Sequence, residues 1–487
     1  MDDSYVSLLV KTKAKDSVAG MNKGRIALPH FAGNRTATLL QTQSGELLLL
    51  GDGLNNGSGN SMVKFLQVCL FIAVMTKVNS LSQQFVYQKF SSFYENTEIK
   101  SPSAITQREF AFFLLKQRVM VRHKSFVNLS SLKSILCGNV PSDVYHSCAY
   151  YENPEADMSK KGWLGSDLVF DIDADHIPTS CNKSHDEWTC KQCGSSGNGV
   201  TPERCSNCGG QRLDSKTWPC ELCLASAKEE TAKLVDMLQN DFGFLDEELG
   251  VFFSGHRGYH VHVVSESSKT LDALARKEIV DYITGLGLEL CGKGKAPSNR
   301  KASSRIFRLH DFGRHIRLRQ DLSQFIERAT ENDLACAGIR SKKAIAAILQ
   351  YKQQILGRCI EEGLWTSING VTDETWFKLA EYLTNIESAK IDTVVTTDIH
   401  RLIRMDGTLH GKTGLEKVGF PVSRLDAFDP FTEAVAFKDG TAKVFVSNAP
   451  EFRLGGKVFG PFRNKTVELP TAAAVLLVCK GRAEVKE

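Results

Sequence analysis

The chain has 487 residues, of which 42% are hydrophobic and 24% charged, and its formal net charge is +4. This length calls for more than one hydrophobic core, and this composition is that of a globular rather than a disordered or fibrous protein. No stretch reaches the roughly 18–20 apolar residues of a membrane span. Because the net charge is small, any binding site for a polyanion must be a local cluster of basic residues.

The hydrophobic pattern divides the chain into recognisable segments. Residues 1–61 show no clear periodicity and form an extension whose role the sequence does not indicate. In chain order, the pattern then predicts a helix from Leu81, paired strands between Arg108 and Phe126, one buried strand over 163–173, a helix over Ala225–Phe242, a hairpin over Val251–Val264, helices over 322–390, and strands and turns from Asp392.

Two carboxylates end the buried strand predicted over 163–173. Asp171 and Asp173 follow the apolar residues Leu168, Val169 and Phe170. Residues two apart on a strand point to the same face, so both carboxylates project together. A divalent metal ion that neutralises them explains the arrangement. A loop cap or a solvated turn is the alternative for an isolated D-x-D motif.

Basic residues follow in two further segments. The predicted hairpin contains Ser254, Arg257 and His260, which offer hydrogen-bond donors suited to phosphate oxygens, although an exposed hairpin is an alternative. Downstream, Asp392 precedes a run of cations. This run contains Arg401, Arg404, His410 and Lys412. A carboxylate followed closely by cations suits a site for a metal-bound triphosphate.

Seven of the fourteen cysteines lie between Cys181 and Cys223. Clustered C-x-x-C pairs favour zinc and a reducing compartment over a disulfide framework. The two pairs Cys190/Cys193 and Cys205/Cys208 have the spacing of a zinc ribbon. Free cysteines packed as small hydrophobic residues are the alternative.

Taken together and in this order, the motifs resemble the small catalytic subunit of archaeo-eukaryotic-type DNA primases, as found in archaea. The resemblance extends from about residue 80 to the C-terminus. It rests on Arg108-Glu109-Phe110, Met120-Val121-Arg122-His123, Lys161-Gly162-Trp163, Phe170 to His176, Ser254 to His260, Arg401 to Arg404 and Leu409 to Lys412.

The resemblance implies an α/β (α+β) fold, with a catalytic core of mixed sheets, a zinc knuckle, an inserted zinc ribbon and a helical insertion. The expected domains are the extension 1–61, a first part of the core at 80–321 with the zinc-binding segment 181–223, the helical insertion 322–390, and a second part of the core at 391–487.

The resemblance also implies roles for individual residues. Asp171, Asp173 and Asp392 are expected to bind the catalytic Mg²⁺ or Mn²⁺. Asp392 stands twelve residues before Arg404 and eighteen before His410, as in the family, whereas its rival Asp398 lies closer to Arg401. The expected nucleotide-binding residues are Ser254, Arg257, His260, His410 and Lys412, with Arg122, Lys161 and Arg404 as further candidates.

The family carries a zinc knuckle after its D-x-D strand. Its ligands here are expected to be Cys181, His185, Cys220 and Cys223. The second zinc site, of Cys190, Cys193, Cys205 and Cys208, is an insertion relative to that pattern, and exchange of ligands between the two sets stays open. Closed sites with four protein ligands have no position for substrate, so both zinc ions are expected to be structural.

The implied function is template-directed synthesis of short primers on single-stranded DNA from nucleoside triphosphates, during replication. The expected protein partner is the large primase subunit, and no association with a membrane is expected. The expected location is the cytoplasm, in association with the nucleoid. Residues 293–319, with nine Lys/Arg and one acidic residue, are the candidate for contact with DNA phosphates, or alternatively a solvated loop. The other functions considered are a primer-extending repair polymerase of the same superfamily and a non-catalytic, zinc-containing nucleic-acid-binding protein.

Overall fold

The computed structural model describes residues 22–27, 36–41, 47–51, 81–286, 313–361 and 368–487. The chain divides into two compact units, residues 1–77 and 78–487. Of the first unit, the described residues form an antiparallel sheet of three strands: β1 (Asn22–Ala27), β2 (Thr36–Gln41) and β3 (Leu47–Gly51). The rest of the predicted extension 1–61 lies outside the described residues.

One antiparallel sheet of the second unit carries the D-x-D aspartates and the predicted hairpin. Its order is β16 (Val418–Phe420), β13 (Leu249–Phe253), β14 (Gly258–Val263) and β9 (Leu168–Asp173). Every residue of β14 is buried, and α5 (Glu221–Asn240) packs against β14 and β9. The hairpin and the helix predicted from the sequence are thereby confirmed.

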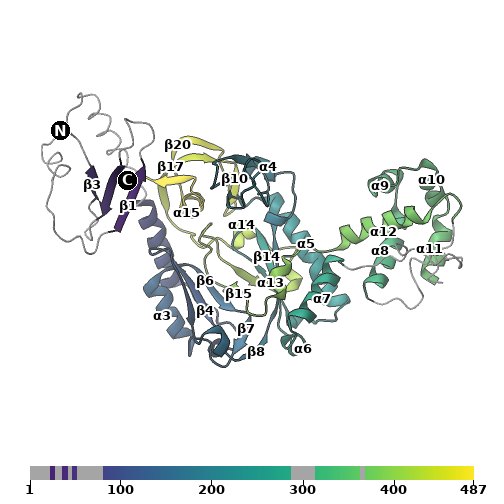
Figure 1. The fold of residues 1–487 in the computed structure, drawn as a ribbon, viewed down its shortest axis with the longest axis horizontal. Coiled ribbons are helices and arrows are strands. Elements are labelled where there is room, and N and C mark those ends of the chain that lie inside the picture. Colours follow the sequence, from purple (N-terminus) through teal and green to yellow (C-terminus); the bar gives the residue numbers. More distant parts are fainter. Residues whose placement is uncertain (1–21, 28–35, 42–46, 52–80, 287–312, 362–367) are drawn as a thin grey trace. The chain divides into compact units, whose positions relative to one another are not determined.

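A second antiparallel sheet has the order β15 (Leu402–Arg404), β6 (Pro141–Ser147), β4 (Phe110–Leu114) and β5 (Met120–Lys124). Residues 81–96 are helical, and α3 (Leu129–Asn139) lies beside β4 and β6 (Figure 1). Phe90, Phe110 and Leu132 from these elements share one buried core. The helix from Leu81 and the paired strands before Phe126 are therefore confirmed.

The single strand predicted over 163–173 is wrong. The segment forms two strands in different sheets, since β8 (Trp163–Ser166) pairs with β7 (Ala149–Tyr151) and β9 pairs with β14. The break falls at Asp167, whose buried carboxylate pairs with Arg108 Nη2 at 2.7 Å and accepts a hydrogen bond from the Tyr150 hydroxyl at 2.6 Å. These partners come from distant parts of the chain, so the local pattern does not reveal the break.

The cysteine-rich segment folds into small elements. These are α4 (Asn182–His185) and a three-stranded sheet in the order β11 (Ser196–Asn198), β10 (Glu187–Cys190) and β12 (Leu213–Lys216). Trp188, Cys190 and Cys205 form its small buried core. A core of this size needs a crosslink or a bound metal ion to be stable.

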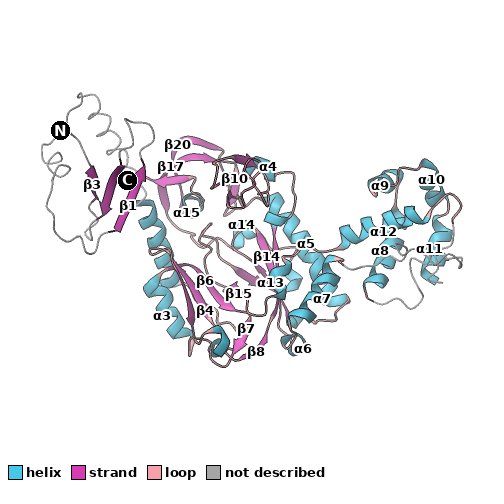
Figure 2. Ribbon diagram, viewed as in Figure 1, coloured by secondary structure: helices cyan, strands magenta, loops and turns pink. Residues whose placement is uncertain are grey.

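Five helices form a cluster with a core of its own (Figure 2). They are α8 (Arg314–Arg328), α9 (Glu331–Cys336), α10 (Lys342–Gln350), α11 (Lys352–Glu361) and α12 (Asp373–Glu387). The predicted helical segment therefore begins at Arg314 rather than at residue 322. Leu318, Leu322 and Ile326 form the buried apolar face of α8. Because α8 also contains four arginines, the hydrophobic pattern does not show where this helix begins.

The remaining elements complete the second unit. They are α6 (Glu266–Lys269), α7 (Ala273–Thr284), α13 (Thr393–Thr397), α14 (Pro430–Glu433), β17 (Thr441–Ala449), β18 (Phe452–Leu454), β19 (Lys457–Phe459), β20 (Phe462–Pro470), α15 (Thr471–Cys479) and β21 (Ala483–Val485). The uncharged helix α15 packs against the sheet β20-β17-β21. Its burial fixes the position of Lys480, which follows it directly.

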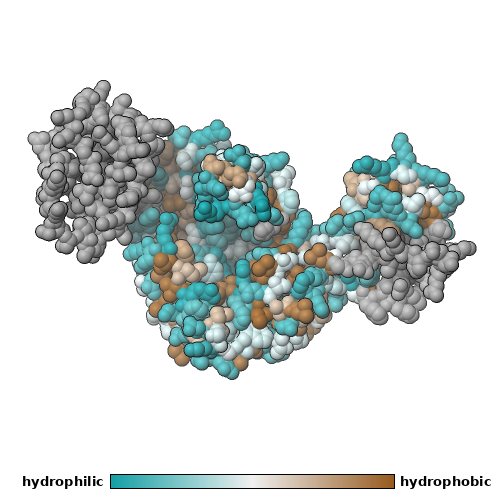
Figure 3. Space-filling model, in the orientation of Figure 1, coloured by the Kyte–Doolittle hydropathy of each residue, from teal (hydrophilic) through white to brown (hydrophobic). Residues whose placement is uncertain are grey.

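Within the described ranges, no helix is long and apolar enough to cross a membrane. On the face in Figure 3, hydrophobic residues form small separate groups among hydrophilic ones. Most of the basic stretch 293–319 lies outside the described residues, and its last part, from residue 313, belongs to the start of α8.

Candidate active site and zinc centres

Three carboxylates from two distant segments lie close together. Asp171 and Asp173 are half-buried at the end of β9. Asp392 is held beside them because its amide donates a hydrogen bond of 2.8 Å to the Asp171 carbonyl. Its own Oδ1 accepts from the Val394 amide at 3.0 Å, so Asp392 caps the short helix α13, which packs against β9.

The electrostatics of Asp171 reflect this arrangement. Burial, and after it the charges of Asp173 and Asp392, raises the pKa of Asp171 to about 7. Asp398, the rival candidate, accepts a hydrogen bond from the His400 amide at 2.9 Å. Burial, followed by the charges of Glu109 and Asp398, raises the pKa of Tyr151. Geometry therefore joins Asp392, rather than Asp398, to the D-x-D strand.

The hairpin β13–β14 positions His260 against this group. In the register of β14 with β9, His260 lies opposite Asp171 and Gly258 lies opposite Asp173. His260 Nε2 is 3.5 Å from Asp171 Oδ1. A Cβ atom on Gly258 would come within 2.2 Å of the Ile172 carbonyl oxygen, so only glycine permits this close pairing. Burial lowers the pKa of His260, which keeps its ring neutral.

The hairpin turn also contacts the loop that contains His410 and Lys412. The Thr413 hydroxyl donates a hydrogen bond of 2.5 Å to the Gly255 carbonyl. Gly255 has a φ of +83°, and a Cβ atom there would lie 2.9 Å from the His410 Cβ. Two of the predicted nucleotide-binding segments are thus packed directly together.

At this junction, two histidines and two lysines form a cluster. The rings of His256 and His410 are stacked with centroids 5.0 Å apart and an angle of 21° between their planes. Lys480 Nζ lies 2.6 Å from His256 Nε2, and the exposed Lys412 donates its backbone N–H to His410 Nδ1 at 3.1 Å. Sequence reasoning missed Lys480, because it stands alone behind an apolar helix and only the folding of α15 places it here.

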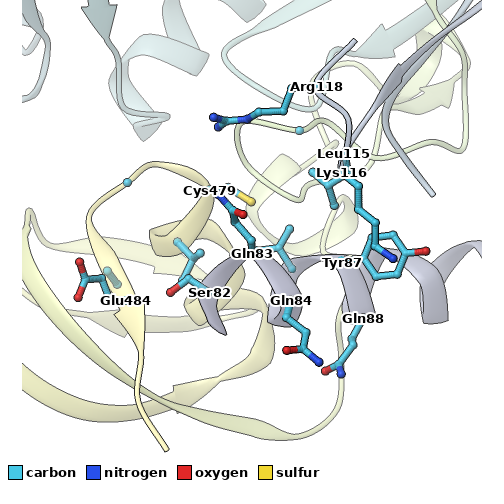
Figure 4. Close-up of a pocket in the computed structure, with 15 residues that line it drawn as sticks. Ser82, Gln83, Gln84, Tyr87, Gln88, Leu115, Lys116, Arg118, Cys479 and Glu484 are labelled. Atoms are coloured by element: carbon cyan, nitrogen blue, oxygen red, sulfur yellow. The ribbon is translucent and has the colours of Figure 1, made fainter. Parts of the chain in front are cut away.

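A cavity of about 810 Å³ adjoins the cluster. Its lining includes Gly411, and also Cys479 and Gly481 on either side of Lys480. The opposite wall contains Lys116 and Arg118 from the turn between β4 and β5, and Figure 4 shows the Arg118 guanidinium directed toward the Cys479 side. The cavity therefore lies next to the cluster, and its lining includes two basic side chains.

Three of the predicted nucleotide-binding cations are buried and have carboxylate partners within the protein. Arg257 is buried and pairs with Asp186 at 2.8 Å and with Asp175. Burial lowers its pKa to about 10. These contacts direct the Arg257 guanidinium toward the zinc-binding segment.

Arg404 and Lys161 are the other two. Arg404 is buried and pairs with Asp143 at 2.5 Å, and Asp143 also accepts a hydrogen bond from the Gly411 amide at 3.1 Å. Lys161 is 3.1 Å from Glu109, which Arg122 contacts at the same distance. Burial raises the pKa of Glu109, but Lys161 and Arg122 together hold it below its ordinary value. Each of these cations is thus bound to a protein anion.

Cys181, His185, Cys220 and Cys223 form one group whose ligand atoms all lie within 4.8 Å of one another. The sulfur atom of Cys181 is 3.5 Å from those of Cys220 and Cys223. Tetrahedral zinc with sulfur at about 2.3 Å requires sulfur–sulfur distances of about 3.8 Å, so the group fits zinc. His185 Nδ1 is 2.7 Å from Asp186, which leaves Nε2 facing Cys223 Sγ at 3.6 Å.

The second group consists of Cys190, Cys193, Cys205 and Cys208 and meets the same 4.8 Å limit. The Cys190–Cys208 and Cys193–Cys205 sulfur distances are 3.6 and 3.7 Å. Hydrogen bonds, of which the largest contribution comes from the Ser195 backbone, lower the pKa of Cys193 to about 6, which favours the thiolate that binds metal. The structure thus separates the eight side chains into the two sets expected from the sequence, and each can hold zinc.

Comparison with known proteins agrees with these features. A family model described as DNA primase small subunit matches residues 210–423. The DNA primase small subunit PriS of Methanococcoides burtonii is 32% identical over 422 residues, covering 83% of this chain and 98% of the relative. The PriS proteins of Nitrosopumilus maritimus and Cenarchaeum symbiosum are 31% and 33% identical, covering 84% and 80% of this chain and 100% and 95% of their own lengths. The chain therefore belongs to the DNA primase small subunit family.

Proposed function

We propose that this chain synthesises short primers on single-stranded DNA by template-directed nucleotidyl transfer, with Asp171, Asp173 and Asp392 as its catalytic carboxylates. One observation carries the assignment, namely the hydrogen bond of 2.8 Å from the Asp392 amide to the Asp171 carbonyl. It brings a third carboxylate to the D-x-D strand at the cost of mutual repulsion. A DNA-binding surface without chemistry has no use for such a group.

The donor set suits Mg²⁺ or Mn²⁺. Carboxylate oxygens are the ligands these cations prefer, and burial, followed by the charges of Asp173 and Asp392, raises the pKa of Asp171. When bound, the cations would activate the attacking hydroxyl and neutralise the triphosphate. The three aspartates would hold them, and no protein base is then required.

The phosphates of the incoming nucleotide would be bound by His410, Lys412, Ser254 and His260. When neutral, His410 accepts at Nδ1, so its proton is on Nε2 and can be donated to a phosphate oxygen. Ser254 Oγ accepts from the amides of His256 and Gly258, each at 3.3 Å, which leaves its hydroxyl proton for the ligand. Neutral His260 beside Asp171 can donate without adding a charge.

Arg257, Arg404 and Lys161 take positioning roles in this proposal, because protein carboxylates already bind them. Arg257 orients the hairpin, and Arg404 acts through Asp143 on the loop at Gly411. Lys161 and Arg122 share Glu109, but Arg122 is 43% exposed and can still reach a ligand phosphate. Both zinc ions would be structural, since each group already supplies four ligands.

A small primase subunit works with a large subunit and a DNA template, and we expect both partners here. The proposed primers are ribonucleotide chains. Their synthesis would take place on chromosomal DNA, in the nucleoid. The catalytic core would consist of residues 80–321 and 391–487, with residues 322–390 as a helical insertion and residues 1–61 as an extension.

De novo synthesis by the purified chain tests the proposal. The assay contains single-stranded DNA, labelled nucleotides and Mg²⁺ or Mn²⁺, with and without the large subunit. Short products that disappear in the Asp171→Ala/Asp173→Ala double variant are expected. If the wild-type chain only extends a supplied primer, even with the large subunit present, the chain is a repair-type polymerase instead.

A further inference from the structure

We propose that Lys480 is a further phosphate-binding residue of this site, and that it binds the pyrophosphate end of the nucleotide together with His256, His410 and Lys412. The inference rests on the proposed function, and it adds a residue from the C-terminal part of the chain that none of the sequence motifs contains. Lys480 would bind the β- and γ-phosphates of the nucleotide before nucleotidyl transfer and inorganic pyrophosphate after it.

Lys480 lies at the junction of two segments expected to bind the nucleotide. Lys480 Nζ lies 2.6 Å from His256 Nε2, and the His256 ring stacks on that of His410. His256 occupies the hairpin turn, next to Ser254 and Gly255, and His410 belongs to the loop joined to this turn through Thr413. Lys480 therefore contacts one of the two segments expected to bind the triphosphate, and the stacked histidine rings join that segment to the other.

The two histidines of the cluster lie among positively charged side chains. The charged groups with the largest effects on His256 are Lys480, His410, Lys412 and Arg404, and all of them lower its pKa, as burial does. His410 has the same surroundings, with Arg404, Lys480 and Lys412 lowering its pKa. The cluster therefore combines two lysines with two neutral histidine rings, which together offer hydrogen-bond donors to a bound polyanion.

The pKa of Lys480 is also lowered. Burial, and after it the charges of Arg257 and Lys412, lowers its pKa to about 7, although Asp186 opposes the shift. Lysines in protein cores are ordinarily paired with a carboxylate. The closest polar group to the Lys480 amine is instead a histidine nitrogen, which a phosphate oxygen can replace or share.

The residues beside Lys480 border a cavity. Cys479 and Gly481, on either side of Lys480, line the cavity of about 810 Å³, as does Gly411 between His410 and Lys412. Lys116 and Arg118 line the same cavity (Figure 4). The cavity thus lies next to the backbone that carries Lys480 and Lys412, and two further basic side chains line it.

Binding of inorganic pyrophosphate with Mg²⁺ tests the assignment in the full chain. Lys480→Met should raise the inhibition constant for pyrophosphate and the dissociation constant for a nucleoside triphosphate roughly tenfold or more, since a charge-assisted hydrogen bond is lost. Binding of the corresponding nucleoside monophosphate should change less than twofold, and Lys480→Arg should restore most of the triphosphate affinity. Lys465→Met, which removes the same charge from an exposed position on β20, is the matched control.

A measurement on the wild-type chain does not depend on the folding of any variant. An amine-acylating reagent should modify Lys480 rapidly near neutral pH, and saturating pyrophosphate should slow this modification at least roughly fivefold, as read by mass spectrometry of the Lys480 peptide. Equal rates with and without pyrophosphate, or unchanged pyrophosphate inhibition in a folded Lys480→Met chain, would overturn the role of Lys480. The proposed function fails separately, if Asp171→Ala/Asp173→Ala retains synthesis.

Discussion

Asp186 Oδ2 lies 2.8 Å from Arg257 Nη1, and the other oxygen of the same carboxylate lies 2.7 Å from His185 Nδ1. One buried carboxylate thus joins the hairpin beside the catalytic aspartates to a candidate zinc ligand. A carboxylate that orients a ligating histidine is a common feature of zinc sites. Here the Asp186 carboxylate connects a candidate structural zinc site directly to the hairpin that carries His260.

Replacing Asp186 by Asn should therefore affect both sites at once. The buried Arg257 loses its main partner, which costs on the order of 3 kcal/mol of stability, and His185 loses the group that fixes its ring. We expect a lower melting temperature and faster loss of zinc to a chelator. Asp214→Asn is the control, because Asp214 forms an exposed pair with Lys191 at 3.6 Å in the ribbon. Equal zinc loss in the two variants would contradict the link.

Elemental analysis should find two zinc ions per chain, one for each ligand group. Cys193→Ser/Cys208→Ser should reduce the content to about one and should leave the catalytic core folded, because the ribbon has its own small core. Cys220→Ser/Cys223→Ser should also destabilise the core, since Cys223 is buried against α5 and β9 residues. A zinc content near one per wild-type chain would show that the ribbon cysteines do not bind zinc.

The raised pKa of Asp171 makes the stability of the chain depend on pH. Between the ordinary pKa of 3.8 and about 7, the native state keeps a proton that the unfolded chain has released. The resulting stabilisation is present at pH below about 4 and is lost as pH rises through about 7. Without added divalent cation, the melting temperature of Asp171→Asn should therefore exceed that of the wild type by a margin that grows from pH 5 to pH 8.

Added Mg²⁺ should reduce this margin, because it binds and stabilises the ionised Asp171 and competes with the proton. Melting curves for both proteins, measured across this range with and without Mg²⁺, check the sign. Parallel pH profiles of the two proteins would show that Asp171 titrates normally.

Local sequence signals predict the parts of this site that short-range geometry controls. The two-residue period of a strand places Asp171 and Asp173 on one face, and C-x-x-C spacing brings sulfur atoms together. The hairpin around Gly258 is equally local, since its glycines allow the close approach of strands. For these elements the sequence pattern and the fold agree.

Other features depend on contacts between distant segments and have no local signal. At the break, Asp167 pairs with Arg108, which lies just before β4, and Arg257 turns toward Asp186 rather than toward solvent. Lys480 reaches His256 only because α15 is buried in the C-terminal sheet. In each case a buried charge finds a partner that is remote in the sequence.

Primer synthesis by Asp392→Asn and Asp398→Asn, compared in one assay on single-stranded DNA with Mg²⁺, tests the central claim most directly. The two changes are chemically identical and lie at opposite ends of α13. Only Asp392 donates its amide to Asp171. Asp392→Asn should lower the rate by roughly a hundredfold or more, since a carboxylate that binds the catalytic cations is lost, whereas Asp398→Asn should stay within about threefold of the wild type. Loss of synthesis in Asp398→Asn with retention in Asp392→Asn would contradict the three-carboxylate site described above.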